Sequence, residues 1–281
     1  MQWKVGVCGV SEFGRKFTPL FKAHPMVSEV AIADVRSDVL ADVARENGIE
    51  RTFASFDEMV NSDVDAIALF TQRWSHAPLA VQALKAGKHV YSAVPAAATL
   101  EELEELVKTV EETGLTYMLG ETSYYRPPNI YCRKRFANGD FGKFVYGEGH
   151  YYHDMSHFYA PYYKANGEEW KRVASYPPML YPTHSVCHVL GVTFSRMTSV
   201  SSLGFVDSHP DGIFDKDLSL WGNVFSNETG LFRTADGGMA RINEFRRSGA
   251  GESRQQPQSY DWAKLRHQPA RKRIGDEPAG M

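Results

Sequence analysis

The chain contains 281 residues, of which 43% are hydrophobic and 12% aromatic, enough to form the core of one large domain or two ordinary domains. Its formal net charge of -3 lacks the positive excess expected for binding nucleic acid or an anionic membrane, so we expect a small neutral partner. The 3 cysteines are scattered, which argues against a disulfide framework and a structural zinc site and favours a cytoplasmic location. No apolar run approaches the roughly 18 residues of a membrane span, so no transmembrane segment is expected.

The first part of the chain alternates between strand-like and helix-like patterns. Short runs rich in apolar and β-branched residues occur at 3–10, 29–35, 65–71, 89–94 and 116–121. Amphipathic runs typical of helices lie between them, most clearly at 37–48 and 100–114. This alternation predicts an α/β domain over residues 1–121, with a parallel sheet that binds its ligand at the carboxyl ends of the strands.

The pattern changes after residue 121. Longer strand-like runs follow at 142–153, 197–207, 220–234 and 238–247, and the turn ADGG separates the last two. These runs predict a second, α+β domain over residues 122–248 with an open, largely antiparallel sheet. Residues 249–281 are rich in Gln, Pro, Arg and Gly and are expected to form an irregular tail.

The stretch GVSEFG, Gly9 to Gly14, follows the first expected strand and opens a helix, as a dinucleotide-binding loop does. Ser11 replaces the second glycine, which usually lets the backbone approach the diphosphate. Asp34 ends the second expected strand, where a carboxylate accepts hydrogen bonds from the ribose of NAD. Arg36 leaves NADP open, since an arginine there accommodates a 2′-phosphate. A glycine turn in a nucleotide-free sheet is the structural alternative.

Three stretches, KVGVCGVSEFG, FTQRWSHAPLAVQALKAGKHVYSAVPAA and GDFGKFVYGEGHYYHDMSH, resemble the Gfo/Idh/MocA family of nicotinamide-dependent oxidoreductases. The resemblance covers residues 3–247. It implies a Rossmann domain that binds NAD and a second domain, with a sugar, cyclitol or related polyol between them. The cofactor-binding positions it implies are Gly9, Ser11, Phe13, Gly14, Asp34, Arg36, Thr71, Val94 and Pro95. Family members generally have Glu-Lys-Pro where this chain has Ala93-Val94-Pro95, so the usual catalytic lysine is absent.

Another residue must take the hydroxyl proton, because the aliphatic Val94 cannot. The family's second signature, an Asp and a His four residues apart on a helix, aligns with His184 and His188 in YPTHSVCH. Histidine titrates near neutral pH, so we expect His184 to be the proton acceptor and His188 to orient the substrate or pack beneath it. No metal is expected, since the pair lacks the Glu of HExxH and an assured third ligand. A structural role remains open for both.

The segments GHYYHD and LYPTHS, with Val-Pro-Ala-Ala, are similar to NAD-dependent retaining glycosidases of the α-N-acetylgalactosaminidase type. This narrower resemblance implies that Tyr151 takes part in catalysis and that Glu121, Tyr181 and Arg172 contact the substrate. His76, at the carboxyl end of a Rossmann strand, is a further candidate for substrate contact or for packing. The chain departs from these glycosidases after His184 and before Val94, which leaves the net reaction open.

We therefore expect an NAD-dependent oxidoreductase acting on a sugar-like polyol. A glycosidase that recycles its NAD and a non-catalytic NAD-binding protein remain alternatives because the lysine is absent. Members of the family usually continue with further strands and helices, so the second sheet is expected to be incomplete at its C-terminal end. A homo-oligomer formed through that sheet is the expected partner arrangement.

Overall fold

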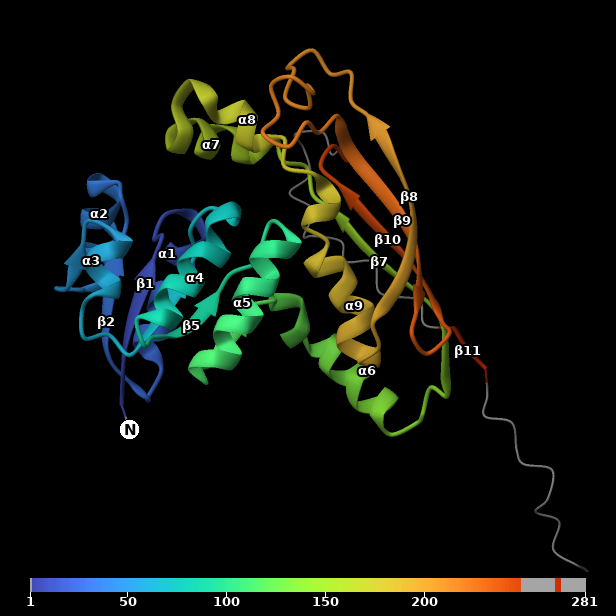
Figure 1. Cartoon of the computed structure of the whole chain (residues 1–281), viewed down its shortest axis with the longest axis horizontal. Coiled ribbons are helices and arrows are strands. Elements are labelled where there is room, and N and C mark those ends of the chain that lie inside the picture. The colour runs from blue at the N-terminus through green and yellow to red at the C-terminus, as the bar shows by residue number, and fades with distance from the viewer. Residues whose placement is uncertain (1, 249–265, 269–281) are drawn as a thin grey trace, which may run out of the picture. The chain divides into compact units, whose positions relative to one another are not determined.

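The computed structural model describes residues 2–248 and 266–268. It divides into two compact units, Met1–Glu121 and Thr122–Met281. Each unit has its own sheet (Figure 1).

The first unit is built on a six-stranded parallel sheet in the order β3-β2-β1-β4-β5-β6. Its strands are β1 (Trp3–Cys8), β2 (Val27–Ala33), β3 (Thr52–Phe53), β4 (Ala66–Leu69), β5 (His89–Ser92) and β6 (Tyr117–Leu119). The order reverses between β1 and β4, which is the topology of a doubly wound dinucleotide-binding sheet. The expected α/β class and the five expected strands are confirmed.

Helices cover both faces of this sheet. They are α1 (Glu12–Ala23), α2 (Ser37–Asn47), α3 (Phe56–Val60), α4 (His76–Lys85) and α5 (Leu100–Thr113), with the 3₁₀ turn η1 (Arg73–Ser75) before α4. On one face, Ile67 and Leu69 of β4 join a core with residues of α3, α4 and α5. On the other, Ala68 and Phe70 join a core with residues of α1 and α2. Successive strand residues thus serve opposite cores, so the strands are almost continuously apolar.

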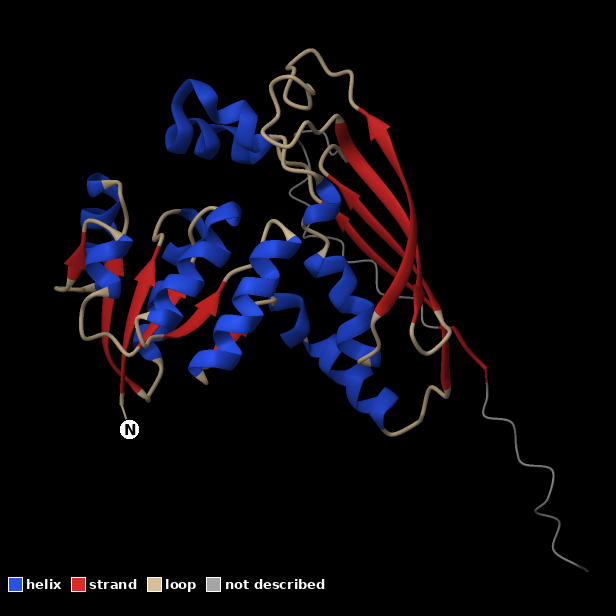
Figure 2. Cartoon of the chain, viewed as in Figure 1, coloured by secondary structure: helices blue, strands red, loops and turns tan. Residues whose placement is uncertain are grey.

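The second unit has helical segments both before and after its first strand. They are η2 (Thr122–Tyr125), α6 (Pro127–Ala137), η3 (Ser156–Phe158), α7 (Tyr159–Asn166), η4 (Gly167–Glu169), α8 (Trp170–Ala174), η5 (Pro178–Leu180) and α9 (Thr183–Thr193). Helix α9 packs against β7, β10 and α6 (Figure 2). Val189 of α9 lies in a buried cluster with Phe144, Ala240 and Ile242 of the sheet. The expected helix around His184 and His188 is confirmed.

The second sheet has the order β11-β7-β10-β9-β8. Its strands are β7 (Lys143–Tyr152), β8 (Met197–Val206), β9 (Phe225–Thr234), β10 (Met239–Phe245) and β11 (Arg266–Gln268). All neighbouring pairs are antiparallel except β7 and β10, which are parallel. The long connection between these two strands allows that pairing. The largely antiparallel sheet is therefore confirmed, with one parallel pair that the sequence did not indicate.

Two boundaries differ from the expected ones. Strand β9 begins at Phe225 and not at residue 220, because Gly222 has a φ of +61° and the Asn223 side chain bonds both the N–H and the C=O of Phe225, which makes a turn. Residues 266–268 form β11 on the edge of β7, so the irregular tail expected over 249–281 does not hold at those three residues. The rest of that tail lies outside the described residues.

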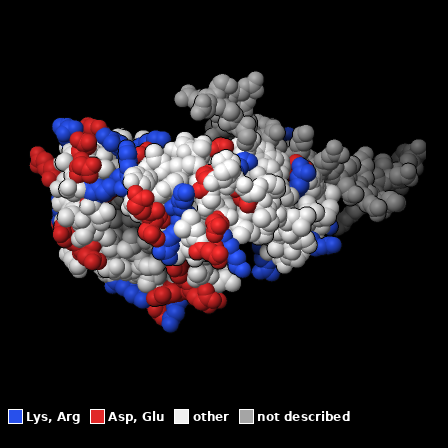
Figure 3. All heavy atoms as spheres, turned by 90° about the horizontal axis from the view of Figure 1, so that it is seen from above, with Lys and Arg blue, Asp and Glu red and all other residues white. Residues whose placement is uncertain are grey.

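Basic and acidic side chains are interspersed on the face of the molecule shown in Figure 3. Over the described part of the chain, no helix is both long enough and apolar enough to cross a membrane.

Candidate active site

The loop from Gly9 to Gly14 requires glycine at both ends. Gly9 has a φ of +85°, and a Cβ on it would lie 2.7 Å from the Phe70 carbonyl oxygen. A Cβ on Gly14 would lie 2.1 Å from the Gly9 carbonyl oxygen. These approaches hold the start of α1 close to β1 and to the end of β4. The backbone therefore has the tight strand-to-helix turn that a dinucleotide loop needs.

No side-chain hydrogen bond caps the start of α1 in this loop. Ser11 precedes the helix and makes no side-chain capping hydrogen bond. Phe13 is 47% exposed, and its ring packs on Phe17 with centroids 4.9 Å apart. An uncapped helix start suits an anion, although the Glu12 carboxylate lies in the same turn and opposes one.

Asp34 follows β2 and turns its carboxylate toward this loop. One oxygen accepts the Val10 N–H at 3.0 Å, and the other accepts the Arg36 N–H at 3.0 Å. The Arg36 side chain lies beside it, with Nε 3.7 Å from the carboxylate. Each carboxylate oxygen retains acceptor capacity, so the position fits a ribose diol. Together with the glycine loop, this set of residues fits NAD.

His76, the first residue of α4, is 1% exposed. Its Nδ1 lies 2.9 Å from the carbonyl oxygen of Pro95, and its Nε2 lies 3.1 Å from that of Thr71. Burial is the main cause that lowers its pKa. A neutral imidazole has one N–H and can donate to only one of these two carbonyl oxygens. The buried ring nevertheless lies between the loops that follow β4 and β5. This buried position favours the packing alternative, and contact of His76 with substrate stays a prediction.

The loop after β5 contains Val94, the position at which the resemblance predicts the family's lysine. Val94 is 8% exposed and packs as an apolar residue before Pro95. Glu121, which ends the first unit after β6, is also 8% exposed. Thr71 follows β4, and its Oγ1 lies 2.8 Å from the Ser75 hydroxyl. The predicted positions therefore follow β1, β2, β4, β5 and β6, all at the carboxyl edge of the parallel sheet.

In the second unit, three predicted residues come together at the start of α9. The Tyr181 hydroxyl lies 3.3 Å from Nε2 of His184 in the first turn of the helix. The Tyr151 ring, from β7, has its centroid 5.1 Å from the His184 ring and 6.3 Å from the Tyr181 ring. We call Tyr151, Tyr181 and His184 the tyrosine–histidine cluster. It combines a titratable imidazole with two aromatic rings of the kind that stack on sugars.

Two side chains that the sequence did not single out adjoin this cluster. His153 Nδ1 lies 2.6 Å from the Tyr151 hydroxyl. The guanidinium of Arg246 lies 5.3 Å from the centroid of Tyr151 and 5.8 Å from that of Tyr181. Arg246 also pairs at 2.9 Å with the fully buried Glu244. The sequence pattern that could have indicated Arg246 is its spacing from Glu244, because residues two apart on a strand point to the same face.

Two other predicted residues do not join the cluster within the described part of the chain. His188 is 6% exposed, and its Nδ1 lies 3.2 Å from Nδ2 of Asn129 in α6. It packs between the two helices, which favours the packing alternative, and its catalytic role stays a prediction. Arg172 is exposed on α8 and pairs with Glu169 at 2.9 Å. This surface pairing does not support its predicted contact with substrate.

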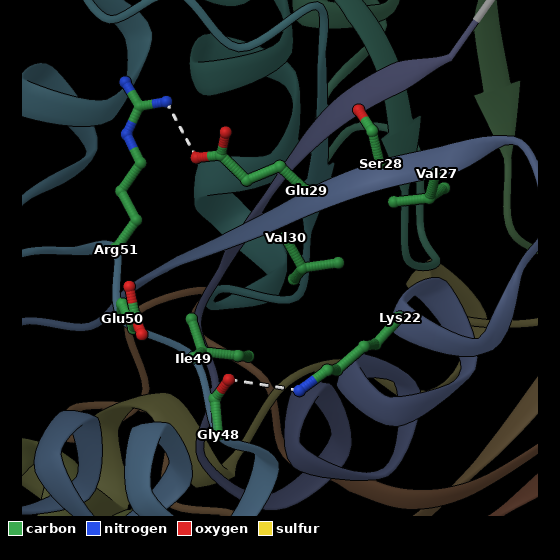
Figure 4. A pocket seen from close by; sticks show the side chains of 9 residues that line it. All are labelled: Lys22, Val27, Ser28, Glu29, Val30, Gly48, Ile49, Glu50 and Arg51. Atoms are coloured by element: carbon green, nitrogen blue, oxygen red, sulfur yellow. Dashed lines mark hydrogen bonds and ion pairs between the residues drawn. The ribbon is translucent and has the colours of Figure 1, made fainter.

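A cavity of about 430 Å³ lies elsewhere in the first unit (Figure 4). Val27 and Val30 of β2 line it together with Gly48–Arg51, and Lys22 donates to the Gly48 carbonyl at 3.1 Å. This is the edge where β2 begins, opposite the edge that carries Gly9 and Asp34. The cavity is therefore separate from the dinucleotide loop. In residues 2–248 and 266–268, no three His, Cys, Asp or Glu side chains are placed to hold a metal ion.

A comparison with family models matches residues 3–121 to the Gfo/Idh/MocA oxidoreductase family, described by its NAD-binding Rossmann fold. This match covers the glycine loop, Asp34 and the loop with Val94. Residues 3–121 belong to the Gfo/Idh/MocA oxidoreductase family. The first unit is thus an NAD-binding Rossmann domain of that family.

Relatives of known description extend the similarity into the second unit. The chain is 31% identical over 220 residues to a glycosyl hydrolase family 109 protein of Saccharopolyspora erythraea, a match that covers 71% of this chain and 47% of the relative. It is 33% identical over 152 residues to an alpha-N-acetylgalactosaminidase of Bacteroides fragilis, covering 50% of this chain and 36% of the relative. These matches span about half or less of the relatives' length.

A solved structure shows the same fold as both units. The scyllo-inositol dehydrogenase of Lactobacillus casei, with bound NAD(H) and scyllo-inositol, matches with a TM-score of 0.71 at 21% identity. The match covers 87% of this chain and 70% of that chain. The family's two-part architecture, an α/β Rossmann unit followed by a sheet-based unit, is therefore confirmed.

Proposed function

We propose that this protein is an NAD-dependent oxidoreductase acting on a sugar or sugar-like polyol without the family's usual lysine. The observation that carries the proposal is the hydrogen bond between Tyr181 and His184 beside the Tyr151 ring. It supplies a protic, titratable group in a chain whose Val94 is buried and cannot move a proton. The family membership of the first unit supports the redox chemistry.

The first unit holds NAD in this proposal. The backbone of the Gly9–Gly14 loop and Ser11 face the diphosphate, while Asp34 accepts from the adenosine ribose and repels a 2′-phosphate. Phe13, Thr71, Val94 and Pro95 line the cofactor, and Arg36 flanks Asp34. When bound, the nicotinamide supplies the hydride acceptor.

The second unit supplies the group that accepts the proton of the substrate hydroxyl. Oxidation of a secondary alcohol needs a group that takes the hydroxyl proton, and the His184 imidazole does so from the first turn of α9. Tyr181 holds the imidazole by a hydrogen bond, and Tyr151 presents its ring to the substrate. Glu121 is a further substrate-binding residue, and the substrate is a neutral carbohydrate.

A second candidate is a glycosidase that oxidises and later reduces its sugar, so that NAD is recycled. One observation favours it: the similarity to a glycosyl hydrolase family 109 protein extends over 220 residues, beyond the Rossmann domain. A third candidate is an NAD-binding protein without turnover, which the absence of the lysine favours.

One assay separates the three candidates. The full chain is incubated with NAD and either scyllo-inositol, N-acetylgalactosamine or p-nitrophenyl α-N-acetylgalactosaminide, while NADH and p-nitrophenol are both measured. The oxidoreductase forms NADH in proportion to the carbohydrate consumed. A glycosidase releases p-nitrophenol without accumulating NADH. A protein that binds NAD but gives neither signal is the non-catalytic candidate.

A further inference from the structure

Arg246, just after β10, has a donor that the protein does not satisfy. Its side chain is 5% exposed. Nη2 donates to Glu244 at 2.9 Å and to the Pro178 carbonyl at 3.2 Å. Nη1 is buried and has no hydrogen-bond partner among the described residues. A buried charged donor without an acceptor is unfavourable, so such a group marks a position where a ligand or an ordered water completes the bonding.

This donor lies beside the tyrosine–histidine cluster. The guanidinium carbon is 5.3 Å from the centroid of Tyr151 and 5.8 Å from that of Tyr181. Ser185, the residue after His184, donates to the same Glu244 carboxylate that pairs with Arg246. The arginine is therefore tied both to the two rings and to the first turn of α9. An acceptor bound at Nη1 would lie next to the residues proposed to hold the carbohydrate.

The charges around Arg246 indicate what kind of acceptor it takes. Glu244 is fully buried and already neutralises the guanidinium. A second carboxyl, Glu228, lies opposite Glu244 in the pairing of β9 with β10, and Arg246 acts to lower its pKa against the larger raising effect of burial. The group therefore carries no net positive charge that would draw in an anion. An uncharged hydroxyl or carbonyl oxygen satisfies Nη1 without burying another negative charge beside two carboxyl groups.

We propose that Arg246 is a substrate-binding residue whose Nη1 donates a hydrogen bond to a hydroxyl or carbonyl oxygen of the carbohydrate. It selects neutral sugars and polyols over uronates and sugar phosphates. The inference rests on the proposed function, because the tyrosine–histidine cluster is the proposed carbohydrate site.

Calorimetry on the NAD-saturated full chain tests this role with three probes: scyllo-inositol, N-acetylgalactosamine and glucuronate. We expect at least one neutral probe to bind and glucuronate to bind more weakly. Arg246→Lys keeps the pairing with Glu244 but loses the second nitrogen of the fork, so it should weaken the neutral probe about tenfold or more. The affinity for NAD should not change, whereas a general loss of structure would lower the affinity for the neutral probe and the affinity for NAD together.

Arg247→Lys is the matched control. Arg247 donates to Asp207 and Asp211 through Nε and Nη2, and its Nη1 reaches the Tyr159 hydroxyl, so all three nitrogens have protein partners.

A double change, Glu244→Gln with Arg246→Gln, removes both buried charges together if Arg246→Lys folds poorly. Unchanged binding of the neutral probe in either variant overturns the role of Arg246, and tighter binding of glucuronate overturns the selectivity. If no probe binds the wild-type chain, the carbohydrate assignment fails, and this inference fails with it.

Discussion

Asp34 shows how one side chain serves both the fold and the proposed cofactor site. Its two oxygens accept the N–H groups of Val10 and Arg36 at 3.0 Å each, which fixes the carboxylate against the glycine loop. The same oxygens have lone pairs left for a ribose. The neighbouring Arg36 is held to Asp34, so it is engaged by a carboxylate and less suited to a 2′-phosphate.

Replacing Asp34 with Ala should weaken NAD binding. It should also reduce the difference between the protein's affinities for NAD and NADP. Hydrogen bonds to a charged group contribute about 1.5–3 kcal/mol, so we expect the NAD dissociation constant to rise about tenfold or more. Calorimetry with both dinucleotides measures the change, and Asp38→Ala, an exposed acid on α2, is the control. Equal or tighter binding of NADP by the wild-type chain would contradict the assignment.

At the scale of elements, Glu228 joins β9 to the 3₁₀ turn η5 ahead of the cluster. Its carboxylate accepts the Met179 N–H at 2.6 Å. Burial raises its pKa above the ordinary value of 4.5, and the opposing effects of that hydrogen bond and of Arg246 are smaller. The folded state therefore binds this proton more tightly than the unfolded state, and stability falls as the pH rises from about 4.5 through the folded pKa.

Glu228→Gln should remove that pH dependence, because the amide keeps an acceptor for Met179 and carries no charge to bury. We expect the variant to be more stable than the wild type near neutral pH, with a higher Tm. Thermal melts of both proteins across pH 4 to 8 provide the test, with the exposed Glu104→Gln as control. A variant less stable than the wild type at neutral pH would show that the ionised carboxylate is the stabilising form.

The elements were more predictable than the contacts of individual residues. Continuous apolar runs identify parallel strands, and alternation followed by ADGG identifies β9 and β10, because these patterns depend only on which residues are buried. The start of β9 was misplaced because Asn223 and Gly222 form a turn that apolar periodicity does not reveal. The parallel pairing of β7 and β10 depends on a long connection, which the local sequence does not specify.

The same limit explains the candidate site. Tyr151, Tyr181 and His184 were found through motif resemblance, and the structure brings them together. His76 and His188 have the same side chain as His184, but their burial against backbone carbonyls and Asn129 follows from tertiary packing. Arg246 went unnoticed because an arginine near a strand end is ordinarily exposed, and only the buried Glu244 makes it an inward residue.

At the scale of the whole molecule, one face of the second sheet presents large apolar side chains. Leu203 is 83% exposed, Phe205 60% and Leu231 58%. The strand register puts all three on the face opposite Phe232, which packs in the buried cluster against α9. An apolar surface of this kind is typical of an interface, so we propose that two copies of the chain associate through it.

The oligomer proposal predicts a species larger than a monomer in light scattering after size-exclusion chromatography. Leu203→Lys combined with Phe205→Lys should shift it to the monomer, because two buried charges oppose the association. Leu218→Lys, at a position that is 36% exposed and outside the sheet, should leave the oligomer intact. A wild-type chain that is monomeric at every concentration would contradict this proposal.

The central claim is that the first unit binds NAD and that His184 of the second unit accepts the substrate proton. The most direct measurement compares His184→Ala with the wild type in kcat for NADH formation and in NAD affinity. We predict that kcat falls by about 10² to 10⁴ while the NAD dissociation constant stays the same. The exposed His24→Ala should retain full turnover. Full turnover by His184→Ala, or a loss of NAD binding equal to the loss of rate, would contradict the claim.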